Sequence, residues 1–223
     1  MKRTKLIDRL LPPYTRGEEW FNAISHMVGG VFGIVALILA TVVAALHASV
    51  WAIASAVVYG LSLILLYTIS SIYHALRPPM AKKVMQVLDH CAIYVLIAGT
   101  YTPILLCRVR ETYPAEAWTL FGVVWGVALL AVTLNAIDLK KYRVFSMIAY
   151  LSMGWSVVFA ARPVMATVPG EGLAWLLAGG IAYTLGAILY GIGSKKKWFH
   201  SVFHIFVVIG SVCHFVTILC YVL

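Results

Sequence analysis

The stretch WAIASAVVYGLSLILLYTISSIYHAL occupies residues 51–76 and contains no lysine, arginine, aspartate or glutamate. A helix needs ~20 apolar residues to cross the ~30 Å hydrocarbon core of a bilayer, so this stretch is long enough to do so. The sequence Arg77-Pro78-Pro79 follows it and is typical of the end of a helix. Residues 51–76 therefore predict a transmembrane helix.

Six further stretches have the same character. They lie at about residues 24–45, 84–106, 117–137, 143–162, 173–193 and 200–222. The connections between them are short, and residues 1–23 form a charged tail that lacks the apolar core of a signal peptide. We therefore expect an all-α fold, a single domain over residues 1–223 that is a bundle of seven transmembrane helices.

The composition agrees with a membrane protein. Hydrophobic residues make up 62% of the 223 residues and charged residues 11%, whereas soluble domains average roughly 45–50% and 25%. A net charge of +9 would suit nucleic-acid binding, but the basic residues stand in short clusters between long uncharged stretches. We therefore expect membrane lipids as partners and no nucleic acid.

The basic residues also predict the orientation, because lysine and arginine in short loops stay on the cytoplasmic side of a membrane. With seven helices, all but three of the 17 lysines and arginines fall on the side of the N-terminal tail; the exceptions are Arg108, Arg110 and Arg162. The N-terminus is therefore predicted to be cytoplasmic and the C-terminus outside.

Ionisable side chains inside a membrane are costly and are commonly functional. His200 and His204 are four residues apart, which on a helix is about 40° around the axis and ~6 Å along it, so both imidazoles can reach one metal ion. The predicted topology places His74, at the end of its helix, and Asp89, early in the next helix, at the same depth. The alternative is that the histidines are interfacial and that Asp89 meets interfacial water.

Three neutral imidazoles bind Zn²⁺ and leave its fourth position open for a water, which is the arrangement of a catalytic zinc site. We therefore assign His74, His200 and His204 as candidate zinc ligands. Asp89 is the candidate catalytic residue that holds the zinc-bound water and moves its proton. Ser70, one turn before His74, is the candidate hydrogen-bond donor to that water or to an oxyanion, although it can equally be a helix-packing serine.

The remaining intramembrane histidines are assigned no chemistry. His214 lies ~15 Å deeper than His204 and about 80° off the metal face, so we expect it to pack between helices. His90 points about 100° away from Asp89, and His26 lies near the start of the first helix, where it could support a ligand from behind. A structural role is favoured for both.

Three motifs follow one another along the chain, in or next to the first three expected helices and in the last one. They are Glu19-xx-Asn22-xx-Ser25-His26, Ser70-xxx-His74 followed by Asp89, and His200-xxx-His204. Together they resemble the motifs of the progestin and adipoQ receptor family, in particular its bacterial hemolysin III-like branch. The resemblance covers nearly the whole chain. It implies seven helices in a bacterial plasma (inner) membrane, with zinc held near the cytoplasmic face by the three histidines.

The same resemblance extends to the adiponectin receptors and, more distantly, to the alkaline ceramidases, which are associated with hydrolysis of a lipid amide. It implies a zinc-binding protein of membrane lipid homeostasis and leaves two functions open. One is a zinc-dependent intramembrane hydrolase of a lipid amide or ester, and the other is a non-catalytic membrane-state sensor or receptor-like protein with structural zinc. A pore-forming hemolysin is disfavoured, because no expected helix carries the charged face of a water-filled path.

Overall fold

The computed structural model describes residues 3–47, 49–193 and 196–223. Over these residues the chain is helical and contains no strand. Within the same ranges, seven helices are long and apolar enough to cross a membrane. The expected all-α fold with seven membrane-spanning helices is thereby confirmed.

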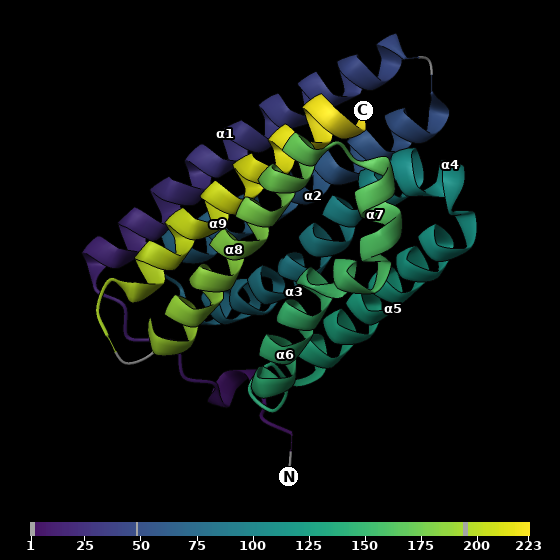
Figure 1. The fold of residues 1–223 in the computed structure, drawn as a ribbon. Coiled ribbons are helices and arrows are strands. Elements are labelled where there is room, and N and C mark those ends of the chain that lie inside the picture. Colours follow the sequence, from purple (N-terminus) through teal and green to yellow (C-terminus); the bar gives the residue numbers. More distant parts are fainter. Residues whose placement is uncertain (1–2, 48, 194–195) are drawn as a thin grey trace.

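The spans follow one another in chain order (Figure 1). The first two are α1 (Arg16–Leu46) and α2 (Val50–Ala75). The third is α3 (Pro79–Pro103) continued by η2 (Ile104–Val109) and α4 (Arg110–Thr112), and the fourth is α5 (Pro114–Asp138). The fifth joins α6 (Arg143–Gly154), η3 (Ser156–Ala160) and α7 (Ala161–Thr167). The last two are α8 (Gly170–Gly193) and α9 (Phe199–Thr217) with its final turn η4 (Ile218–Val222). A short helix η1 (Leu6–Asp8) precedes them.

The first helix begins at Arg16 rather than near residue 24, so the expected tail of residues 1–23 is shorter in the structure. Thr15 and Glu18 form a capping box: the amide of Glu18 donates to the hydroxyl of Thr15, and the amide of Thr15 donates to the carboxylate of Glu18 at 2.8 Å. Hydropathy locates only the part of a helix that lies in lipid, so it misses the first turns, which carry charge.

The helices pack in neighbouring pairs. α1 lies along α2, α8 lies along α9, and α3 contacts both α2 and α5 (Figure 1). Small residues let α1 and α2 approach closely: a Cβ at Gly60 would lie 2.6 Å from the Cβ of Leu37, and one at Gly29 would overlap the buried ring of Tyr67. This close approach fixes how the ends of α1 and α2 meet.

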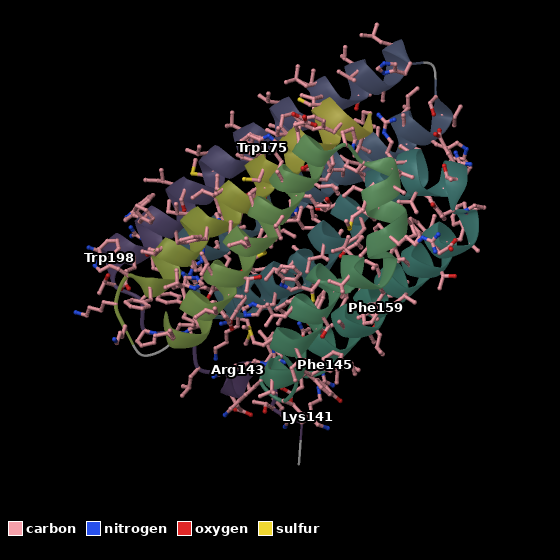
Figure 2. The ribbon with its side chains drawn as sticks, viewed as in Figure 1. Lys141, Arg143, Phe145, Phe159, Trp175 and Trp198 are labelled. Atoms are coloured by element: carbon pink, nitrogen blue, oxygen red, sulfur yellow. The ribbon has the colours of Figure 1, made fainter. Side chains whose placement is uncertain are left out.

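Large apolar side chains cover the outside of the bundle. Phe159 is 91% exposed and Trp175 is 42% exposed, and Figure 2 shows both on its surface. Basic residues such as Lys141 and Arg143 gather instead at the end where the N-terminal residues lie (Figure 2). An apolar surface of this extent belongs in lipid, and the chain is a multi-pass integral membrane protein.

Candidate metal centre

Three buried histidines converge where the end of α2 meets the start of α9. His74 lies in the last turn of α2, and His200 and His204 occupy the first two turns of α9. The Nε2 atom of His200 lies 3.4 Å from that of His74 and 3.1 Å from that of His204. None of the three residues is more than 7% exposed. Their ring nitrogens, all within 4.8 Å of one another, could hold a metal ion.

The spacing of these nitrogens is compatible with a shared metal ion as well as with hydrogen bonds between the rings. Ring nitrogens can pair when one donates and the other accepts, but a neutral imidazole has only one N–H to give. In a tetrahedral site with metal–nitrogen bonds of about 2.0–2.1 Å, the nitrogens stand about 3.4 Å apart. The observed separations of 3.4 and 3.1 Å are close to that value.

Glu19, in the first turns of α1, sets the ring orientation of His74. Its Oε2 atom lies 2.7 Å from Nδ1 of His74, and its Oε1 atom accepts from Nζ of Lys82 at 2.8 Å. Because a carboxylate only accepts, Nδ1 of a neutral His74 carries the proton, and Nε2 is then the nitrogen whose lone pair a metal can use. Lys82 also donates to the carbonyl oxygens of His74 and Leu76, at 3.3 and 3.2 Å. Sequence reasoning placed Glu19 in a motif without a role in the site, and it assigned Lys82 no part in the site.

Ser70 and Asp89, the other two predicted site residues, lie on α2 and α3. Ser70 is buried on α2, one turn before His74, and Asp89 is half-buried on α3. Among the contacts of the described residues, neither side chain forms a hydrogen bond with an imidazole of the cluster. The structure thus brings the three histidines together, and the roles of Ser70 and Asp89 stay predictions.

Tyr14, two residues before α1, covers the cluster. Its ring stacks on that of His200, with centroids 4.7 Å apart and 15° between the planes, and lies 5.9 Å from the ring of His74. Burial raises the pKa of the Tyr14 phenol above its usual range, and the negative charge of Asp89 is among the smaller causes. The phenol therefore remains neutral.

Buried polar atoms without a protein partner surround His204. Its ring stacks on that of His26, with centroids 3.8 Å apart. Among the described residues, Nδ1 of His204, both ring nitrogens of His26, the side-chain amide of Asn22 and the hydroxyl of Ser201 lack a hydrogen bond. Such atoms cost about 1–3 kcal/mol each when left unpaired. Among the described residues, protein atoms thus leave unused hydrogen-bonding capacity beside His204.

The other two intramembrane histidines lie outside the cluster and link helices. Nδ1 of His90 lies 2.8 Å from the carbonyl oxygen of Gln86, and its Nε2 lies 3.0 Å from the hydroxyl of Tyr190 on α8. Nε2 of His214 lies 3.1 Å from the carbonyl oxygen of Leu176, also on α8. These contacts agree with the structural roles favoured for both residues.

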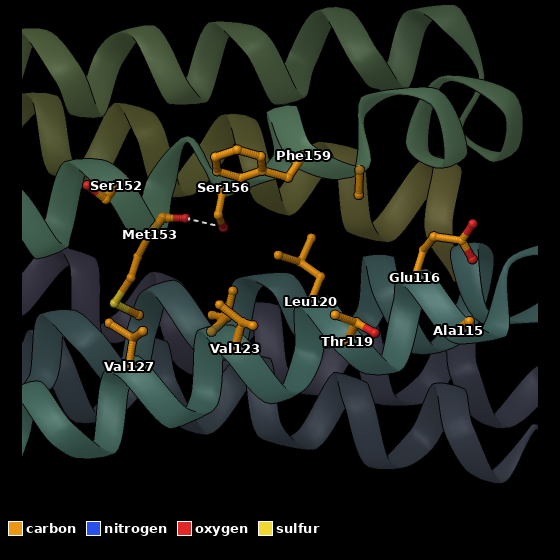
Figure 3. A pocket seen from close by; sticks show the side chains of 12 residues that line it. Ala115, Glu116, Thr119, Leu120, Val123, Val127, Ser152, Met153, Ser156 and Phe159 are labelled. Carbon is orange, nitrogen blue, oxygen red and sulfur yellow. Dashed lines mark hydrogen bonds between the residues drawn. The ribbon is translucent and has the colours of Figure 1, made fainter.

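Two cavities differ in their relation to the cluster. One of about 320 Å³ opens beside it, and its lining includes His74, Glu19, Arg16, Arg77 and Trp20. The other, of about 470 Å³, lies between α5 and the α6–η3 segment; its lining is mostly apolar and includes none of the three histidines (Figure 3). Of these two cavities, the smaller one lies beside the three histidines and is placed to give a ligand access to them.

Residues 14–215 match the family model described as Haemolysin-III related. The chain is 38% identical over 206 residues to Hemolysin-3 of Bacillus cereus, covering 92% of each chain. It is 38% identical over 208 residues to the Hemolysin-3 homolog of Bacillus subtilis (strain 168), covering 93% of this chain and 96% of the relative. The human Monocyte to macrophage differentiation factor is 26% identical over 175 residues, which cover 75% of this chain and 70% of that protein. No solved structure matches the chain.

Proposed function

The chain belongs to the haemolysin-III-related family, and from that premise we propose that it is a zinc-dependent intramembrane hydrolase of a lipid amide or ester. Its place of action would be the plasma (inner) membrane of a bacterium, in membrane lipid homeostasis. The observation that carries the proposal is the convergence of three buried ring nitrogens on one point. One of these rings is already held by Glu19 in the tautomer that a metal requires.

Zinc is the metal that we propose for this donor set. The three proposed ligands are imidazoles, with no thiolate and no carboxylate among them. They match the tetrahedral nitrogen sites of zinc enzymes, in which the fourth position stays open. Bound zinc would supply Lewis acidity that polarises a carbonyl group and lowers the pKa of a water molecule. His74, His200 and His204 would hold it.

Asp89 and Ser70 would supply the rest of the chemistry. Asp89 would accept the proton of the attacking water and return it to the leaving group, as a general base and then a general acid. Ser70, buried one turn from His74, would donate a hydrogen bond to the oxyanion that develops on the substrate carbonyl. Glu19 and Lys82 keep His74 oriented while the substrate changes charge.

The cavity beside the cluster supports a lipid as the substrate. Its volume of about 320 Å³ lies at the lower end of the range for ligand pockets. The lining combines apolar side chains such as Leu11 and Trp20 with the cationic side chains of Arg16 and Arg77. Such a lining suits an amphiphile whose polar head lies at the membrane surface, with membrane lipids as the partners of the protein.

A non-catalytic sensor with structural zinc is the second candidate. The burial of the cluster favours it, because His74 and His204 are 2% and 1% exposed and the ring of Tyr14 lies over His200. A site closed in this way would clip α2 to α9 without exchanging water. The two candidates share the metal centre and differ only in turnover.

The first test is the zinc content of detergent-purified protein, wild type beside His74→Ala and His204→Ala. His214→Ala is the matched control, since it removes a half-buried histidine of α9 outside the cluster. We expect about one zinc per chain in wild type and control and little in the other two variants. A wild type without zinc, purified without chelators, would contradict both candidates.

Turnover separates the two candidates. Wild type and Asp89→Asn are screened against lipid amides and esters in mixed micelles. A hydrolase loses turnover in Asp89→Asn while keeping its zinc, because the carboxyl moves protons and does not bind the metal. Zinc without turnover in the wild type favours the sensor.

A further inference from the structure

We propose that the N-terminal segment, residues 3–15, is part of the metal centre: Tyr14 is a positioning residue for His200, and Asp138 anchors the segment across the mouth of the site. The inference rests on the proposed function, since it concerns the same histidines. It adds Tyr14 and the segment of residues 3–15 to the site, and neither belongs to the motifs.

The anchor is Asp138, the last residue of α5, which is 1% exposed. Its Oδ2 atom accepts a hydrogen bond from the amide of Thr4 at 2.6 Å, and its Oδ1 atom lies 4.0 Å from the guanidinium of Arg9. Oδ1 also accepts from the amides of Lys140 and Lys141, both at 3.1 Å. A carboxylate at a helix C-terminus is repelled by the negative end of the helix dipole. The contacts to Thr4 and Arg9 offset that cost.

The middle of the segment is held as well. Arg9 is only 6% exposed, although an arginine in a free tail would be fully solvated. Lys83, near the start of α3, donates to the carbonyl oxygen of Ile7. The segment thus runs from the end of α5 past the start of α3 toward α1, below the bundle in the view of Figure 1. It lies at the end of the bundle where the three histidines meet.

The last part of the segment is tied to α9. Glu18 accepts from the amide of Thr15 at 2.8 Å, and its other oxygen accepts from the amide of Trp198 at 2.7 Å. Trp198 directly precedes α9 and has φ = 67°, a left-handed conformation that is uncommon for a bulky residue and must be held by its surroundings. One carboxylate therefore links Thr15, the residue after Tyr14, to Trp198, which lies two residues before His200.

This arrangement gives Tyr14 a defined task. A metal-binding histidine is usually oriented by a hydrogen bond to its second ring nitrogen, as Glu19 does for His74. Among the described contacts, Nδ1 of His200 has no such partner, and the stacked ring of Tyr14 restricts the imidazole instead. The same ring lines the cavity beside the cluster, so it would also slow the escape of a metal.

The experiment measures how fast metal leaves the full-length, zinc-loaded protein when a chelator is in large excess. Tyr14→Ala is expected to release zinc roughly tenfold faster, the size of effect found when a partner of a metal ligand is removed. Tyr14→Phe keeps the stacked ring and should release zinc at the wild-type rate. Tyr142→Ala, in the loop between α5 and α6 at the same end of the bundle, is the matched control and should also behave as wild type.

A second readout does not depend on metal. Trypsin is expected to cut slowly after the buried Arg9 in wild type and quickly in Asp138→Asn, where the segment loses its anchor. Glu171→Gln, an exposed acid in the first turn of α8, is the control and should cut slowly. Asp138→Asn should also release zinc as fast as Tyr14→Ala.

The outcomes separate this inference from the proposed function. If zinc-loaded Tyr14→Ala and Asp138→Asn release metal at the wild-type rate, the inference is overturned. The assignment of the metal centre is then unaffected. Rapid cleavage of wild type after Arg9, at the rate of Asp138→Asn, overturns the anchored segment whether or not zinc binds. A wild type that binds no zinc contradicts the proposed function and the positioning role of Tyr14 together, while the cleavage pattern still decides the anchor.

Discussion

Glu19→Ala is expected to weaken zinc binding by one to two orders of magnitude. The carboxylate accepts from Nδ1 of His74 at 2.7 Å, and a hydrogen bond to a charged group contributes about 1.5–3 kcal/mol. At 1.4 kcal/mol per factor of ten, its loss corresponds to roughly 10- to 150-fold in the dissociation constant, in line with the 10–100-fold cost of removing a partner of a metal ligand.

Glu19→Gln should be milder, about tenfold. The glutamine oxygen can still accept from His74, but it carries no charge and leaves Lys82 without its anionic partner. Lys82 keeps its bonds to the carbonyl oxygens of His74 and Leu76, so the end of α2 should stay in place. The order wild type, glutamine, alanine therefore reports the contribution of the Glu19 carboxylate, which contacts both His74 and Lys82.

The assay is competition for zinc between the purified protein and a chelating dye of known affinity at pH 7. Glu116→Gln, an exposed carboxylate in the first turn of α5, is the control for loss of a negative charge. Thermal unfolding of the metal-free variants checks that each one folds. Affinity within about twofold of wild type in a folded Glu19→Ala would refute the reasoning, as would an equal loss in Glu116→Gln.

Three further predictions concern packing, catalysis and pH. Gly29→Ala should destabilise the protein by about 1–3 kcal/mol because its methyl group would overlap the ring of Tyr67. The control Gly122→Ala, whose methyl group would have nothing within 4 Å, should be neutral or stabilising. Melting temperatures in detergent compare the two variants, and equal shifts would argue against the close approach of α1 and α2. Asp89→Asn should keep its zinc and lose about 10²–10⁴-fold in hydrolysis, and loss of zinc would make it a ligand instead. Zinc affinity should fall as pH falls, because protons compete for ligand imidazoles; a pH-independent affinity in the dye assay would contradict histidine ligation.

The fold could be predicted because the lipid environment demands it. An uncharged stretch such as residues 51–76 has few alternatives to a membrane-spanning helix, and the structure has α2 at Val50–Ala75. The sequence pattern does not predict the π-helical turn Ile104–Val109 after Pro103. Proline removes one backbone donor, but how the next turn adjusts depends on the helices packed against it.

The candidate site could be predicted in part. The spacing of His200 and His204 follows from helix geometry alone, and His74 joined them through the predicted topology. The roles of Glu19, Tyr14 and Asp138 in the site were not predicted, because charged and aromatic residues near a membrane surface usually face water or headgroups. Their partners lie far away in the chain: Asp138 bonds to Thr4 and Glu19 to His74. Such pairings depend on how the helices assemble.

Zinc K-edge X-ray absorption of the purified wild-type protein is the most direct test of the metal centre. We predict a first shell of three imidazole nitrogens at about 2.0–2.1 Å with one oxygen completing it. Sulfur in that shell, supplied by one of the four cysteines, fewer than three imidazoles, or no bound zinc would contradict the assignment of His74, His200 and His204.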